Sequence, residues 1–173
     1  MLKNYDCSKW KEFVSMQDDA LIKFCDVKFV KGSGKGGQKR NKTSNKVHLS
    51  FFHFQVMDES SRFRELNKTL ALRKLRIKIS LDLSSPQNCH RPKPDKYYIQ
   101  NHEILQLRSI KPNRPEYPFF CGWLLDSFIF IGFDWEALSA FTNFSTSQLT
   151  KWFLANPDVK QKLLEAKSVL ADS

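Results

Sequence analysis

The chain has 173 residues, of which 41% are hydrophobic and 13% aromatic, a globular composition that excludes disorder throughout. The 28 Lys and Arg outnumber 18 Asp and Glu, so the net charge is +10 and we expect a polyanionic partner. The most apolar stretch, from Phe119 to Phe133, is too short for a membrane span and contains Asp126. No secretory signal is visible, and the four cysteines are widely spaced. We therefore expect a cytoplasmic protein without a membrane partner, metal or cofactor.

The positive charge lies in the first two thirds of the chain. Residues 1–60 carry a net charge of +4, residues 61–115 carry +9, and residues 116–173 carry −3. This asymmetry predicts two functional parts, of which the basic one is attracted to phosphate. Residues 31–46 contain four of the six glycines, no acidic residue and six basic residues: Lys31, Lys35, Lys39, Arg40, Lys42 and Lys46.

The first half of the chain predicts a small sheet and one long helix. A short helix is expected over residues 20–24, after Asp18 and Asp19. Alternating apolar residues predict strands over 27–30, 47–51 and 54–57, the last two as a tight hairpin. Ser61 is a candidate N-cap for a helix from about residue 62 to about 79, although the alternation from Leu75 to Leu83 also fits a strand.

The second half predicts a connector followed by helices. Six of the seven prolines lie within residues 84–118. Helices are then expected over 117–131, over 135–141 with Asp134 as N-cap, and from a Ser145 and Gln148 capping box to 155. A fourth begins at Pro157 with Asn156 as N-cap. The expected fold is α+β, with a small mixed sheet packed on a helix. Its domains are a catalytic domain (1–83), a proline-rich basic connector (84–116) and a helical module (117–173), in which the tryptophans form the core.

The glycine-rich segment 32–37 admits several interpretations. It satisfies GxGxxG, but the polar segment 38–42 follows where a dinucleotide site needs an apolar helix. A P-loop also fails, because Gly36 follows Lys35 where Ser or Thr is required. A mobile basic loop that joins two strands is the structural alternative.

A third interpretation comes from resemblance. Residues 32–44, with Gly36-Gly37-Gln38 and Asn41-Lys42, resemble the GGQ loop of peptide chain release factors and their ribosome-rescue relatives. The segment from Arg62 to Leu75 is similar to the helix that follows this loop in the family, with Phe63-Arg64 in place of Ser-Gln. Parts of residues 115–158 are similar to the end of short bacterial release-factor-like proteins.

This resemblance implies ribosome-dependent hydrolysis of the peptidyl-tRNA ester, with Gly36, Gly37 and Gln38 as the catalytic residues. The expected partners are large-subunit rRNA at the peptidyl-transferase centre, peptidyl-tRNA, and a candidate methyltransferase that acts on Gln38. Ser33 and Asn41 are expected to brace the loop. The residues expected to contact RNA are basic: Lys31, Lys35, Lys39, Arg40, Lys42, Arg62 and Arg64.

Other functions stay open at this point. The sequence has no segment for codon reading, so we expect rescue of stalled ribosomes rather than stop-codon recognition. The alternative is a non-catalytic RNA- or ribosome-binding protein that retains the loop. Residues 134–155 resemble a helix-turn-helix, but their candidate recognition helix carries one cation, Lys151, so we expect no DNA partner. The adjacent Cys89 and His90 are too few for a metal site, and packing or surface positions are expected for His48 and His53.

Overall fold

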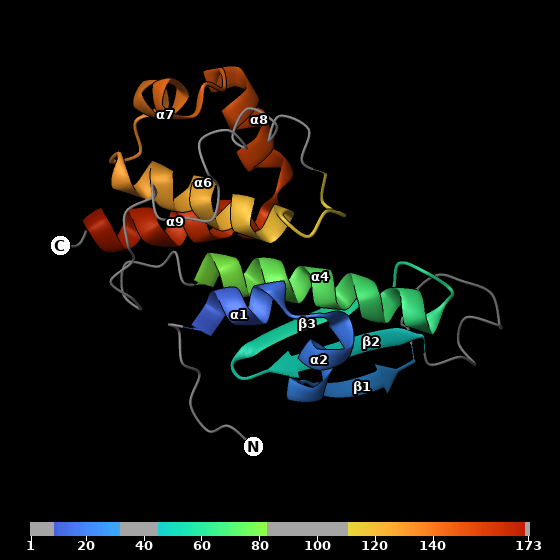
Figure 1. The fold of residues 1–173 in the computed structure, drawn as a ribbon. Helices are drawn as coiled ribbons and strands as arrows, with labels where there is room; N and C mark the ends of the chain where they lie inside the picture. Colours follow the sequence, from blue (N-terminus) through green and yellow to red (C-terminus); the bar gives the residue numbers. More distant parts are fainter. Residues whose placement is uncertain (1–8, 32–44, 83–110, 172–173) are drawn as a thin grey trace. The chain divides into compact units, whose positions relative to one another are not determined.

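The computed structural model describes residues 9–31, 45–82 and 111–171 (Figure 1). It is an α+β protein, as the sequence predicts. The chain divides into two compact units, residues 1–79 and residues 80–173, each of which is described by itself. The first unit contains the sheet, and the second is helical among its described residues. Most of the predicted connector, residues 83–110, lies outside the described residues.

Three strands form the sheet of the first unit, in the order β1-β2-β3, and both pairs are antiparallel, so the prediction of a mixed sheet is wrong. They are β1 (Asp26–Val30), β2 (Lys46–Phe51) and β3 (Phe54–Asp58). The predicted hairpin is confirmed, with Phe51 opposite Phe54 and Phe52 at a φ of 50° in the tight turn. Val47, Leu49 and Phe51 alternate on one face of β2 and are fully buried, so this face belongs to the core.

The long helix α4 (Arg64–Asp82) covers the sheet (Figure 1). It packs through a helical stripe of buried residues, Ala71, Leu75 and Ile79. The strand alternative beyond Leu75 is wrong, because α4 continues without a break to Asp82. The helix begins at Arg64, two residues after the predicted start at about residue 62. The hydroxyl of Ser61 accepts the N–H of Phe63 at 3.0 Å, just before the helix.

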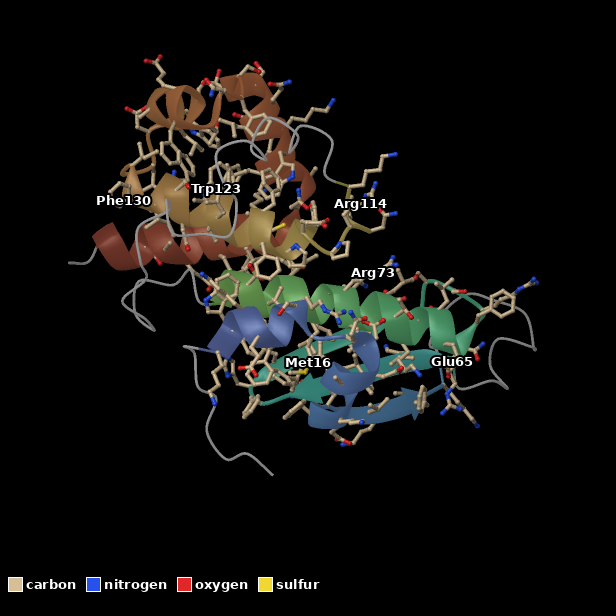
Figure 2. The ribbon with its side chains drawn as sticks, in the orientation of Figure 1. Met16, Glu65, Arg73, Arg114, Trp123 and Phe130 are labelled. Atoms are coloured by element: carbon tan, nitrogen blue, oxygen red, sulfur yellow. The ribbon has the colours of Figure 1, made fainter. Side chains whose placement is uncertain are left out.

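An N-terminal helical layer in the first unit is joined to α4. It comprises α1 (Trp10–Ser15), α2 (Asp18–Leu21) and the 3-10 turn η2 (Ile22–Phe24). The sequence predicts the second and third of these but not α1. The guanidinium of Arg76, on α4, donates to the carbonyls of Val14 at 3.1 Å and Met16 at 2.7 Å, and it pairs with Asp18 at 2.8 Å. Met16, labelled in Figure 2, lies in the chain between α1 and α2. One side chain thus fixes this layer to α4.

The second unit is built from four helices within residues 111–171. They are α6 (Tyr117–Phe130), α7 (Trp135–Thr142), α8 (Thr146–Ala155) and α9 (Pro157–Ala171). Two predicted caps are confirmed. The carboxylate of Asp134 accepts the N–H groups of Glu136 and Ala137, and Ser145 forms the reciprocal capping box with Gln148. These local signals therefore place α7 and α8 correctly.

The core of the second unit is aromatic. The ring of Phe128 lies 4.3 Å from Trp135 and 5.3 Å from Phe153, between centroids. Trp123 is buried, as expected, whereas Trp135 and Trp152 are only half-buried. Figure 2 shows Trp123 on α6, which is buried along most of its length. In the described part of the chain, no helix combines the length and apolar character needed to cross a membrane.

The predicted start of α9 is confirmed. The helix begins at Pro157, directly after Asn156, whose carbonyl accepts the N–H of Lys160 at 2.9 Å. The side-chain amide of Asn156 donates to the carbonyl of Trp152 at 2.7 Å, and its oxygen accepts the Tyr117 hydroxyl at 2.6 Å. The buried phenol needs an acceptor, and Asn156 supplies it. Asn156 therefore joins the end of α8 to α6.

Candidate functional site

The glycine-rich segment begins and ends at neighbouring strand ends. β1 ends at Val30 and β2 begins at Lys46, and these two residues are directly paired. The segment between them therefore leaves and re-enters the sheet at one end, which is the strand-loop-strand context that the sequence predicts. The predicted catalytic residues Gly36, Gly37 and Gln38 lie in this segment but outside the described residues. So do Ser33, Lys35, Lys39, Arg40, Asn41 and Lys42.

A buried asparagine holds the return point of this segment. The amide nitrogen of Asn67 donates to the carbonyl of Asn45 at 2.7 Å and to the carbonyl of Ser61 at 2.8 Å. Its oxygen accepts the N–H of Ser61 at 2.8 Å, and the side chain is fully buried. Such a satisfied buried amide fixes geometry. It therefore connects the residue before β2 to the start of α4.

Asn67 is a residue of this site that the sequence did not single out. A signal was nevertheless present, because Asn67 precedes the buried Ala71 and Leu75 at four-residue spacing. A polar amide in line with an apolar helical stripe is buried with that stripe and must then find hydrogen-bond partners. The partner at Asn45 is 22 positions away, so the sequence alone does not identify it.

Three of the predicted RNA-contacting residues are described, and all three are exposed: Lys31, Arg62 and Arg64. The guanidinium of Arg64 lies over the ring of Phe29, 3.2 Å from its centroid. Phe29 precedes Lys31 by two residues, so this contact brings Arg64 close to the chain around Lys31. Figure 1 shows that α4 begins at the end of the sheet where β1 ends and β2 begins. The structure thus brings these three cations to the base of the glycine-rich segment.

Carboxylates at this end are mostly neutralised. Asp58 is buried, accepts the Ser60 hydroxyl at 2.6 Å and pairs with Lys74 at 2.8 Å. Burial raises the pKa of Asp58, but the hydrogen bonds from Lys74 and Ser60 outweigh this and lower it below its usual range. The hydrogen bond from Lys68 lowers the pKa of the exposed Glu65. Both groups are therefore anionic partners of lysines at neutral pH.

The described residues offer few other groups for catalysis. Burial raises the pKa of Cys25 to about 11, and the charge of Arg76 opposes this only partly. The Cys25 thiol is therefore protonated at neutral pH and is a poor nucleophile. His53 is exposed beside the Phe54 ring, and His48 is half-buried in β2. In the part of the chain that the structure describes, no three His, Cys, Asp or Glu residues are grouped as metal ligands. Cys89 and His90 lie outside it.

The helix pair α7 and α8 has a short turn over residues 143–145, in which Asn143 adopts a left-handed conformation. This is the order of a helix-turn-helix. Lys151 is exposed on α8, but so are uncharged residues: Thr146, Ser147, Gln148, Thr150 and Leu154. A DNA-reading helix needs a basic face to contact phosphates. The surface of α8 therefore gives no support to a DNA-binding role.

No family model, curated protein or solved structure matches this chain. The resemblance to release factors therefore stays a prediction from the sequence.

Proposed function

We propose that this protein is a ribosome-dependent peptidyl-tRNA hydrolase that releases nascent peptides from stalled ribosomes in the cytoplasm. The observation that carries the proposal is the placement of Gly36-Gly37-Gln38. This tripeptide lies in a basic segment whose two ends are joined by the pairing of Val30 with Lys46. The buried Asn67 holds one of these ends, at Asn45. A tripeptide that must reach a distant ester benefits when the ends of its segment are held in place.

The chemistry of the tripeptide supports hydrolysis without a titrating side chain. The amide of Gln38 is not a base at neutral pH, so its contributions are hydrogen bonds. Ester hydrolysis develops negative charge on oxygen in a tetrahedral transition state, which a backbone N–H stabilises. Gly36 and Gly37 leave no side chain to block the approach of substrate and allow backbone conformations with positive φ. Proton transfer is then supplied by RNA groups in the ribosome.

The surrounding cations support docking on RNA. Lys31, Arg62 and Arg64 are exposed at the base of the segment, and further lysines and arginines lie within it. Such a surface is attracted to the phosphates of large-subunit rRNA and peptidyl-tRNA. A methyltransferase that modifies Gln38 is a further proposed partner. The proposed substrate is a stalled ribosome complex that carries peptidyl-tRNA.

The direct test is peptide release from purified stalled ribosomes that carry a labelled peptidyl-tRNA. Gly37→Ala and Gln38→Ala should lower the release rate by about 100-fold or more, because small misplacements of a catalytic group have effects of this size. Gln55→Ala, which removes an exposed glutamine of β3, is the matched control and should release as the wild type does.

The non-catalytic alternative predicts a different result. In that case the protein binds ribosomes but the labelled peptide stays on tRNA, and Gly37→Ala changes neither binding nor release. Release by the wild type that survives Gly37→Ala unchanged would also refute the proposed role of the tripeptide.

A further inference from the structure

The chain presents an aromatic ring to solvent where it enters α4. Phe63 is 57% exposed, and the guanidinium of Arg62 lies 4.8 Å from the centroid of its ring. The nearby Leu66 and Val30 are each 46% exposed. Single exposed apolar residues are common. Here, however, an aromatic ring lies among cations at the base of the proposed catalytic segment.

The backbone of Phe63 is held on both sides. Its N–H donates to the hydroxyl of Ser61 at 3.0 Å, and its carbonyl accepts the N–H of Asn67 at 3.1 Å. Asn67 is itself fixed by bonds to Ser61 and Asn45. The ring therefore projects from a fixed position, which reduces the entropy cost of binding to its face.

The charge around the ring is positive. Arg62 and Arg64 lie over the rings of Phe63 and Phe29, and the charge of Arg64 also helps to lower the pKa of the neighbouring Glu65. Glu65 lies in the first turn of α4, and Figure 2 shows it at this end of the helix. Its carboxylate is paired with Lys68 at 2.5 Å, so its charge is offset. The remaining exposed cations are thus available to phosphate.

We propose that Phe63 is a stacking platform for an unpaired RNA base, while Arg62, Arg64 and Lys31 bind the adjacent phosphates. An aromatic face beside cations fits a single strand, whose bases are accessible, and not a duplex, whose bases are stacked inside. An acidic peptide would use the cations but would leave the ring without a stacking partner.

This inference rests on the proposed function for the origin of the RNA, the ribosome. The binding itself is tested without ribosomes. The wild type and variants are titrated into a fluorescein-labelled single-stranded 12-nucleotide RNA of mixed sequence, and anisotropy is measured over a series of KCl concentrations. The same RNA as a duplex and the matching single-stranded DNA are the comparison probes.

Phe63→Ala should weaken single-strand binding by roughly 5- to 150-fold, the range for removal of one base–aromatic stack. It should leave the salt dependence unchanged, since every cation is kept. Phe63→Tyr should restore binding because it keeps the aromatic face. Arg62→Ala with Arg64→Ala should instead flatten the log–log salt slope by about 0.7 for each phosphate that is no longer neutralised. Phe130→Ala, which removes a 62% exposed ring in the second unit, should bind as the wild type does.

Several outcomes would overturn the stacking site. These are unchanged binding by Phe63→Ala, equal losses in Phe63→Ala and Phe63→Tyr, or binding of the duplex tighter than of the single strand. Equal affinity for the DNA strand would overturn the assignment to RNA and show a site for any single-stranded nucleic acid. Gln38→Ala should bind the RNA normally. A wild-type protein that binds the strand through Phe63 but releases no peptide would refute only the proposed function.

Discussion

The two units of this protein are stabilised in different ways. In the first unit, charged and amide side chains make long-range bonds to the backbone. Arg76 holds the N-terminal layer, and Lys74 and Lys78 donate to the carbonyls of Met57 and Gln55 on β3. In the second unit, aromatic rings pack on one another around Phe128. Both units therefore have a buried apolar core, since Phe13 packs on Phe51 in the first unit at 5.1 Å between ring centroids, and the first unit adds long-range polar bonds from α4 to this core.

This difference has a consequence for substitutions. Removing a buried apolar side chain costs the transfer free energy and leaves a cavity. Removing one partner of a buried hydrogen bond costs the desolvation of the group that is left. Substitutions of buried apolar residues in either unit should therefore have the larger effects on stability, and substitutions of the polar side chains that reach the backbone should have smaller ones.

The largest expected effect is that of Phe128→Ala. Phe128 is fully buried, and its ring contacts those of Phe133, Trp135 and Phe153. Its loss should lower the free energy of unfolding by about 3–5 kcal/mol, measured by denaturant titration. Phe130→Ala, on the same helix but exposed, should change it by less than about 0.5 kcal/mol. Equal effects of the two substitutions would contradict an aromatic core centred on Phe128.

A smaller loss is expected for Gly122→Ala, in α6. A Cβ atom at Gly122 would contact the hydroxyl and the carbonyl of Ser80, the latter at 3.2 Å. The Ser80 hydroxyl donates to the carbonyl of Pro118 at 2.5 Å and has little freedom to move. The expected destabilisation is about 1–3 kcal/mol. In a Ser80→Ala background the added cost of Gly122→Ala should shrink, and an unchanged cost would place the strain elsewhere.

Local signals explain most of what the sequence predicted. Alternation in β2 and the caps at Asp134 and Ser145 involve residues within a few positions, and the structure confirms them. The strand alternative after Leu75 was wrong because leucine and isoleucine repeat at both two- and four-residue spacing there, and only packing on the sheet selects the helix. α1 was not predicted. Its N-cap, Lys9, makes no side-chain cap bond that would mark its start.

Long-range polar contacts account for what the sequence did not predict. Arg76 finds its backbone partners 60 and 62 positions away, and Asn67 finds Asn45 at 22 positions. A sequence shows that a polar residue is in line with an apolar stripe, but not which carbonyl it reaches. The predicted cations Lys31, Arg62 and Arg64 could be named from charge alone. Their meeting at one end of the sheet follows from the register of β1 with β2.

Arg76→Lys tests the long-range polar bonds of the first unit, since it keeps the charge of the side chain but removes its planar donor group. A lysine cannot reach the carbonyls of Val14 and Met16 and the carboxylate of Asp18 together. We expect a loss of about 1–3 kcal/mol in the free energy of unfolding, with amide hydrogen exchange increased in α1. Arg73→Lys, one turn earlier on α4 and labelled in Figure 2, should have almost no effect. A loss confined to global stability, without faster exchange in α1, would contradict the bracing role.

The smallest expected effect is a loss of stability of the first unit in acid, through Asp58. Burial raises the pKa of this carboxyl, but Lys74 and Ser60 lower it further, so its folded pKa lies below the unfolded value of about 3.9. A group with a depressed folded pKa contributes stability that is present above the unfolded value. This contribution is lost as the pH falls through the folded value. The wild type should therefore lose more stability than Asp58→Asn does as the pH falls from about 5 through the lowered pKa of Asp58, measured by denaturant titration at each pH.

Glu65→Gln is the matched control for this acid effect. The pKa of Glu65 is also lowered, chiefly by the hydrogen bond from Lys68, but both charges are at the surface and solvent screens them. Its pH profile should follow that of the wild type. If Asp58→Asn and Glu65→Gln flatten the profile equally, the pair between the buried Asp58 and the exposed Lys74 has no special role in the first unit. If neither variant flattens the profile, the acid sensitivity arises from groups other than these two carboxylates of the first unit.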